Sequence, residues 1–178
     1  SVGSDGPLAL QQSLTGNSLF DRMFERLLKE RYGDITIGPF RSICGNDEVV
    51  WEAPDIEVPM VLITRHPFPE YHTSKDTLDI ISKDKLGETL EVLKDAIVIL
   101  EGDAVFERRF RGLVALSNPR YGLYTERPDP AVVKNLTDAD LRLGELQSFL
   151  PRLLNESFSI YSLAEKFGLP FELLHTYL

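Results

Sequence analysis

The chain has 178 residues, of which 43% are apolar and 26% are charged, and these fractions are those of a soluble globular protein. This length accommodates one domain, or one domain with a small appendage. The formal net charge of −9 disfavours contact with nucleic-acid backbones over the surface as a whole. No window approaches 18 uncharged apolar residues, which excludes a membrane span.

Cysteine usage and the N-terminal residues set the expected compartment. Cys44 is the only cysteine, so an internal disulfide is excluded and a cytoplasmic protein is the simplest interpretation. The first residues lack the basic-then-apolar order of a signal peptide. Met23 is the first methionine, and we therefore expect the chain to be a piece of a longer protein.

The first third of the chain predicts a strand end, a helix, a short strand and a loop. Residues 1–15 combine a short apolar start with turn formers and a polar tail, as at the end of a strand. Ser18 begins a capping box with aspartate three positions later, and apolar residues then recur every three or four positions to about Tyr32. Residues 35–37 predict a short strand. Residues 40–57 have turn formers and no period, which predicts a long irregular loop.

The middle of the chain predicts a buried strand and a long helix. Residues 58–64 are nearly all apolar, as in a strand that is buried on both faces. A polar loop over residues 69–77 follows, and Ser82 is expected to cap a helix that reaches about Glu101. Five side chains of this segment fall on one stripe and make it the strongest helix in the sequence: Leu86, Leu90, Leu93, Ile97 and Leu100.

Residues 106–130 are basic at first and then rich in turn residues, which predicts a connector with one or two short strands near residues 113–116. A proline pair at the end of this segment places a domain boundary near residue 130. The sequence is therefore divided into an α/β domain over residues 1–130 and a helical module over residues 131–178.

The helical module has its own signals. Thr137 begins a second capping box, Ser159 caps a shorter helix, and a turn at Gly168 precedes another helix from Phe171. Helix, helix, tight turn and helix in succession form the outline of a helix-turn-helix, which is truncated within its last helix.

Few residues suggest chemistry by themselves. His72 is a candidate ligand or base, and the alternative is a surface histidine whose neighbours cap the next helix. The adjacent carboxylates of Asp47 and Glu48 suit a ligand pair, and the alternative is a solvated turn. His66 precedes Pro67 without a suitable partner nearby in the sequence and is interpreted as structural.

Several segments occur in an order that is known from one enzyme family. They are Gly45-Asn46-Asp47-Glu48, Trp51, Ile56-Glu57-Val58-Pro59 and Glu70-Tyr71-His72-Thr73-Ser74-Lys75-Asp76-Thr77. This order resembles the di-zinc aminopeptidase superfamily, which includes leucyl aminopeptidases and glutaminyl cyclases. Nearly the whole chain resembles, more closely still, a bacterial and archaeal branch of aminopeptidase-like domain proteins of unknown function in which a winged helix follows the peptidase-like domain.

The resemblance implies both a fold and a site. The fold is the C-terminal half of a three-layer, aminopeptidase-like (phosphorylase/hydrolase-type) α/β domain, followed by a small winged-helix-like module. The implied metal ligands are His72 and Asp5, with Ser4 as the other register. The implied substrate-pocket residues are Asp47, Glu48, Trp51 and Tyr71. Glu48 stands where many aminopeptidases have histidine.

The implied activity is zinc-dependent hydrolysis of a peptide or amide bond, in which two zinc ions hold and activate a bridging water. The superfamily takes its remaining ligands and its general-base glutamate from the half that precedes these residues. We therefore expect no catalytic residue in this chain, no hydrolysis by the chain alone, and weak or absent zinc binding. The expected partners are a small peptide or amide substrate and the remainder of the parent chain, and a homo-oligomer is left open.

Two other functions are left open by the sequence. One is a non-catalytic binding or assembly module of the same fold, and the other is a DNA- or protein-interaction adaptor that uses the helix-turn-helix. Residues 171–178 contain no lysine or arginine, whereas helices that read a DNA groove carry them, so DNA is not an expected partner. The basic residues 108–111 are expected to neutralise an acidic neighbour.

Overall fold

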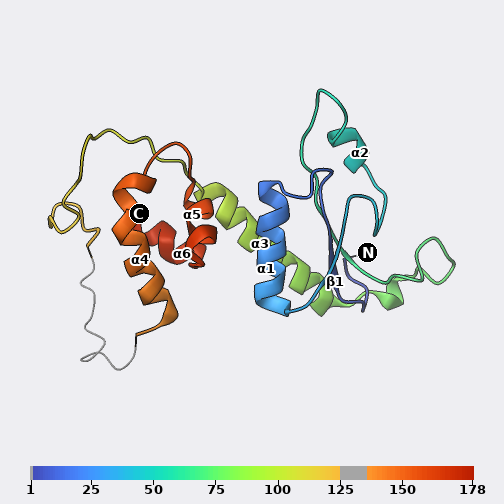
Figure 1. Cartoon of the computed structure of the whole chain (residues 1–178). Coiled ribbons are helices and arrows are strands. Elements are labelled where there is room, and N and C mark those ends of the chain that lie inside the picture. The colour runs from blue at the N-terminus through green and yellow to red at the C-terminus, as the bar shows by residue number, and fades with distance from the viewer. Residues whose placement is uncertain (1, 125–135) are drawn as a thin grey trace. The chain divides into compact units, whose positions relative to one another are not determined.

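The structure is a computed structural model that describes residues 2–124 and 136–178 (Figure 1). The chain forms two compact units, of which one ends at Ile97 and the other begins at Val98. The boundary expected near residue 130 falls among residues 125–135, outside the described part of the chain, and stays a prediction. A long helix, α3 (Lys83–Gly102), begins in the first unit and ends in the second.

The first unit is a mixed α/β structure around a three-stranded sheet of order β2-β1-β3. The middle strand β1 (Leu8–Gln11) pairs in parallel with β2 (Thr36–Gly38) and antiparallel with β3 (Leu62–Arg65). A parallel pair needs a crossover, and α1 (Leu19–Tyr32) supplies it. All four residues of β1 are buried, so this strand forms the centre of the unit.

The N-terminal end of α1 depends on one buried carboxylate. Asp21 is 1% exposed and accepts hydrogen bonds from the backbone N–H and hydroxyl groups of Ser13 (2.7 and 2.5 Å) and Ser18 (2.8 and 2.7 Å). Burial opposes the charge, but these hydrogen bonds outweigh it and lower the pKa of Asp21. The capping box predicted at Ser18 is confirmed, and its aspartate also binds the segment that leaves β1.

Three expectations for the first unit are wrong in detail. The strand of residues 1–15 begins only at Leu8, because residues 3–6 form bends. The strand expected over residues 58–64 is shorter and later, Leu62–Arg65, and as an edge strand it is only partly buried, with Arg65 its one buried residue. The loop over residues 40–57 contains a short helix, α2 (Glu48–Trp51).

The predicted long helix is confirmed as α3, but its apolar stripe does not face the core of the described structure. Leu90 and Ile97 are 55% and 57% exposed, whereas Val92 and Ala96 are buried. The helix therefore has a second apolar face, which is buried and includes Val92, Ala96 and Ile99. A 3₁₀ turn, η1 (Leu78–Ile80), lies shortly before α3.

Among its described residues, the second unit contains three further helices in the predicted order, α4 (Asp138–Leu153), α5 (Ile160–Phe167) and α6 (Phe171–Tyr177). Capping boxes begin α4 and α5 as expected. Buried side chains of these helices, and of the turn between α5 and α6, form the core of the unit: Leu146, Leu150, Leu163, Ala164, Leu169 and Leu174. The strands expected near residues 113–116 are absent from the described segment before residue 125, where the nearest strand-like feature is an isolated bridge between Val105 and Ser159.

Within residues 2–124 and 136–178, no helix is both long enough and apolar enough to cross a lipid bilayer.

Replacing Asp21 with asparagine removes the charge and keeps the shape. Because the folded state lowers the pKa of Asp21, its charge stabilises the fold above about pH 4, and this contribution is lost as the pH falls through the lower folded-state pKa. We expect D21N to lower the free energy of unfolding by about 1–3 kcal/mol near pH 7, with a smaller difference near pH 3. Urea unfolding followed by far-ultraviolet circular dichroism measures both values.

D140N is the matched control, because Asp140 occupies the same capping-box position in α4 but is exposed. It should destabilise the protein less than D21N. Equal effects of the two variants at neutral pH would show that the burial of Asp21 contributes nothing.

Candidate functional site

The first unit contains a pocket of about 380 Å³ beside the end of β3. Three segments line it: the N-terminal segment, the loop before α2, and β3 with the loop that follows. The lining residues are Val2, Ile43, Cys44, Gly45, Asn46, Leu62, Thr64, Arg65, His66, Phe68 and Tyr71. The pocket therefore brings together two segments on which the family resemblance rests: the glycine-asparagine loop at Gly45 and Asn46, and the loop that contains Tyr71.

One side chain of the central strand holds the glycine-asparagine loop in place. Gln11 is 1% exposed, and its side-chain oxygen accepts hydrogen bonds from the backbone N–H groups of Ile43 (3.0 Å) and Cys44 (2.9 Å). The turn before these residues requires a glycine, because a Cβ atom at Gly38 would lie 2.4 Å from the Ser42 hydroxyl oxygen. The last residues of β1 and β2 thus position one wall of the pocket.

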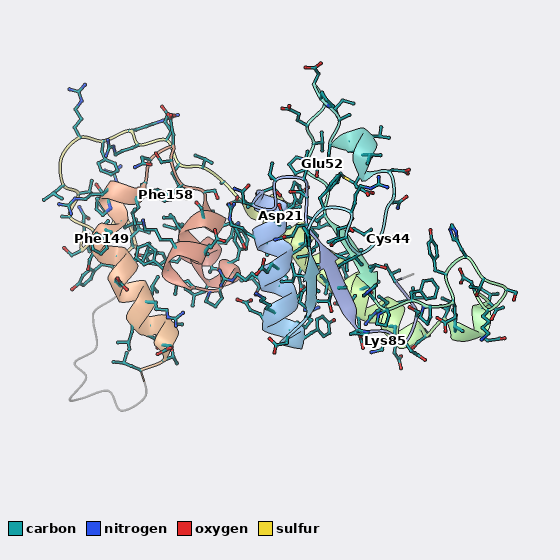
Figure 2. All side chains as sticks on the ribbon, turned by 45° about the vertical axis from the view of Figure 1, so that its right-hand side comes forward. Asp21, Cys44, Glu52, Lys85, Phe149 and Phe158 are labelled. Carbon is teal, nitrogen blue, oxygen red and sulfur yellow. The ribbon has the colours of Figure 1, made fainter. Side chains whose placement is uncertain are left out.

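Two carboxylates stabilise the residues around α2. Glu48 is 5% exposed, its Oε2 accepts a hydrogen bond from the Asn46 backbone (2.7 Å), and its Oε1 lies 3.7 Å from the Arg41 guanidinium. Oε1 of Glu52 accepts from the backbone N–H groups of Leu14 and Met60, both at 2.9 Å. Figure 2 labels Cys44 and Glu52, which flank α2 along the chain. Glu48 therefore orders the pocket loop without lining the pocket.

A buried guanidinium forms another part of the pocket lining. Arg65 is 2% exposed and donates hydrogen bonds to the carbonyl oxygens of Val2 (3.3 Å), Gly6 (3.3 Å) and Lys85 (2.9 Å). It also pairs with Glu88 at 2.8 Å. Hydrogen bonds from Lys85 and Arg65 lower the pKa of Glu88, so this carboxylate keeps the charge that balances Arg65 at neutral pH.

The two implied metal ligands lie on exposed segments. His72 is exposed, has a φ of 60°, and its ring centroid lies 4.0 Å from that of Tyr71. Asp5 is exposed in the turn segment before β1, next to Ser4, which is buried and whose hydroxyl has no hydrogen-bond partner among the described residues. Neither His72 nor Asp5 is part of the pocket lining.

The four implied pocket residues separate into two groups. Tyr71 lines the pocket, whereas Asp47, Glu48 and Trp51 lie on or beside α2 and do not. Trp51, the only tryptophan of the chain, is 50% exposed.

The implied zinc centre needs more donors than these residues supply. Zinc in proteins takes three or four protein ligands, whereas His72 and Asp5 are two. The described residues contain no group of three or more histidine, cysteine, aspartate or glutamate side chains arranged to hold a metal ion. The donor set among the described residues therefore does not fit a complete two-zinc site.

Sequence reasoning missed several pocket residues. His66 was interpreted as structural, and Gln11, Thr64, Arg65 and Phe68 were not considered, yet all but Gln11 line the pocket. A charged residue at the end of an apolar run was the available signal for Arg65. Nothing local in the sequence marks Gln11, because its role depends on a loop more than 30 positions away.

A second hollow, of about 740 Å³, lies in the second unit beside α4. Its lining includes Leu113, Tyr124, Gln147 and Pro151. It contains none of the residues that the sequence implicates in chemistry, so we base the candidate site on the smaller pocket.

Removing the Gln11 side chain should loosen the pocket loop and leave the sheet intact. In Q11A the backbone N–H groups of Ile43 and Cys44 lose their acceptor, so we expect the Cys44 thiol to react several-fold faster with a disulfide reagent. Because Cys44 is the only cysteine, the absorbance of the released thiol reports this site alone.

Q12A provides the neighbouring control, since the Gln12 side chain donates a local hydrogen bond to the Gly16 carbonyl (3.3 Å) and its backbone bond to Gly38 is kept in the variant. The thiol of Q12A should react at the unmodified rate. An unchanged rate in Q11A would contradict the assigned role of Gln11.

Comparison with known proteins supports the fold and identifies the family. No curated protein matches the sequence. The structure is similar to a crystal structure from Clostridium acetobutylicum described as a "putative peptidase", with a TM-score of 0.67 and 17% sequence identity. The similarity covers 99% of this chain, which spans 37% of that chain. This chain therefore has a peptidase-like fold.

Residues 1–103 match the family described as Domain of unknown function (DUF4910), and the chain belongs to that family.

Proposed function

We propose that this chain is one part of an aminopeptidase-like hydrolase that cleaves a peptide or amide bond with the help of zinc. The observation that carries the proposal is the similarity to the Clostridium acetobutylicum structure along 99% of the chain. Because the chain spans 37% of that structure and offers two of the donors that a zinc site needs, the proposal assigns the remaining ligands and the catalytic base to other parts of a longer polypeptide.

In this proposal the chain contributes binding and orientation. His72 and Asp5 each provide one metal ligand. The pocket offers hydrogen-bonding groups from Asn46 and Thr64 and apolar surface from Phe68 and Tyr71, which suits a peptide backbone beside an apolar side chain. Bound zinc would supply an activated water and polarise the scissile carbonyl.

The test compares this chain with a longer polypeptide that contains it. The chain alone should show no turnover of a chromogenic aminoacyl anilide and should retain less than about one zinc ion after dialysis, whereas the longer polypeptide should hold about two. In the longer polypeptide, H72A should reduce turnover by at least about 100-fold, because a lost ligand changes both zinc occupancy and geometry.

K75A is the control for H72A, since Lys75 lies in the same exposed loop and has no assigned role. It should retain turnover. Hydrolysis by the chain alone would show that the site is complete here, and an unchanged rate in H72A would remove the histidine from the metal site.

A second candidate function is a non-catalytic binding module of the same fold. It is favoured by the pocket lining, which contains no aspartate or glutamate and so offers no carboxylate as a general base; His66 is its one histidine. Binding of a short peptide to the longer polypeptide, with zinc absent and no cleavage, would favour this module over the hydrolase.

A further inference from the structure

The pocket beside the end of β3 has polar side chains that the fold itself does not use. Four residues of its lining have such side chains: Asn46, Thr64, His66 and Tyr71. Their side-chain polar atoms have no hydrogen-bond partner among residues 2–124 and 136–178. An amide, a hydroxyl and an imidazole can each donate a hydrogen bond, so the pocket offers several donors to a ligand.

The guanidinium of Arg65 adds a buried donor to the same lining. Arg65 is 2% exposed, and its Nε and Nη1 donate to the carbonyl oxygens of Val2 and Gly6. Its Nη2 donates to the Lys85 carbonyl and the Glu88 carboxylate. These bonds use four of the five N–H donors of a guanidinium. One donor, on Nη1, therefore has no partner in the described part of the chain.

The charges around this guanidinium do not cancel. Glu88 pairs with Arg65 at 2.8 Å and with Lys85 at 2.9 Å, so one carboxylate serves two cations and the cluster has a net charge of +1. The other ion pair beside the pocket, Arg41 with Glu48, is balanced. The lining itself contains no aspartate or glutamate. A ligand carboxylate is attracted to such a site, whereas a ligand ammonium is repelled and finds no charged acceptor in the lining.

The rest of the lining suits an apolar group. The rings of Phe68 and Tyr71 lie 5.9 Å apart, centroid to centroid, and Ile43 and Leu62 add aliphatic surface. The volume of about 380 Å³ is within the range of small-molecule sites. The pocket therefore combines a cationic, donor-rich part with aromatic and aliphatic walls.

We propose that this pocket binds a small acid, in which a carboxylate is attached to an aromatic or branched apolar group. The carboxylate accepts hydrogen bonds from Arg65, Thr64 and His66, and the apolar group packs on Phe68 and Tyr71. The C-terminal residue of a short peptide and a free aryl acid both have this chemistry. The inference rests on the proposed function where it names the end of a peptide ligand that enters the pocket, but the binding itself requires no zinc.

Isothermal titration calorimetry with the chain, after dialysis against a chelator, tests the proposal. Two acids, N-acetyl-L-phenylalanine and 3-phenylpropionate, should bind with dissociation constants of about 1 mM or below. N-acetyl-L-phenylalanine amide should bind at least about 5-fold more weakly than the acid, because hydrogen bonds to a charged acceptor are stronger. Phenethylamine should not bind. Added salt should weaken the acids more than the amide.

The relative affinities of the two acids identify the source of the ligand. Tighter binding of N-acetyl-L-phenylalanine assigns the pocket to a peptide C-terminus, and tighter binding of 3-phenylpropionate assigns it to a free acid. Equal affinities for the acid and its amide, binding of the amine, or no binding of either acid would overturn the proposal.

A pair of threonine variants tests the position of the carboxylate. Thr64 in β3 and Thr36 in β2 both pair with Ala9 of the central strand, but Thr36 is not part of the pocket lining. T64V keeps the shape of the side chain and should weaken binding of N-acetyl-L-phenylalanine by about 10-fold, because the carboxylate loses a donor. T36V should bind like the unmodified chain. Equal affinities of the two variants would contradict a carboxylate beside Thr64.

A pair of lysine variants tests the role of charge without changing the lining. K85Q leaves Arg65 balanced by Glu88, so it should weaken the acids several-fold and leave the amide unchanged. K83Q removes the same charge from Lys83, which is exposed at the beginning of α3, and should have no effect. Equal effects of K85Q and K83Q on the acids would show that the cluster does not attract the ligand.

The binding assay is independent of the hydrolase assay. Acid binding by the metal-free chain, with no turnover by the longer polypeptide, would support the small-acid site and remove the hydrolase. Turnover that is lost in H72A, with no acid binding by the chain, would do the reverse.

Discussion

The buried guanidinium of Arg65 is the interaction on which the first unit depends. A charge that is 2% exposed is tolerated only when its hydrogen bonds are satisfied. Arg65 meets this condition through the carbonyl groups of Val2, Gly6 and Lys85 and the carboxylate of Glu88. One side chain thus fastens the N-terminal segment and the beginning of α3 to the end of β3. The pocket lies where the N-terminal segment and β3 meet the loop before α2, and Arg65 is part of its lining.

The loops of the first unit are held in a similar manner, each by an amide or carboxylate side chain that accepts hydrogen bonds from two backbone N–H groups. Gln11 holds the loop before α2, Glu52 joins the residues after β1 to those before β3, and Asp21 fixes the beginning of α1. A three-stranded sheet with short strands offers few ladder hydrogen bonds. These acceptors fix the connecting loops, which the short sheet cannot order by itself.

The sequence predicted most helices correctly because their signals are local. Capping boxes at Ser18, Thr137 and Ser159 and the apolar period of α3 are read within a few residues of one another. The strands were harder, since burial of the segment that contains β3 depends on its place at the sheet edge and not on its apolar composition. The exposed stripe of α3 was unpredictable for a related reason: both faces of this helix are apolar, so no sequence pattern indicates which face packs against the core.

Of the candidate site, the sequence identified Tyr71 and the glycine-asparagine loop, but it missed Arg65 and Gln11, which act through distant partners.

The position of Trp51 has a consequence for how this protein is observed. It is the only indole of the chain, it is half exposed on α2, and Glu48 and Glu52 anchor the residues on either side of it. Fluorescence excited at the long-wavelength edge of protein absorption, where tryptophan alone absorbs, therefore comes from Trp51 on α2. Changes in the wavelength or intensity of that fluorescence describe α2 and its surroundings.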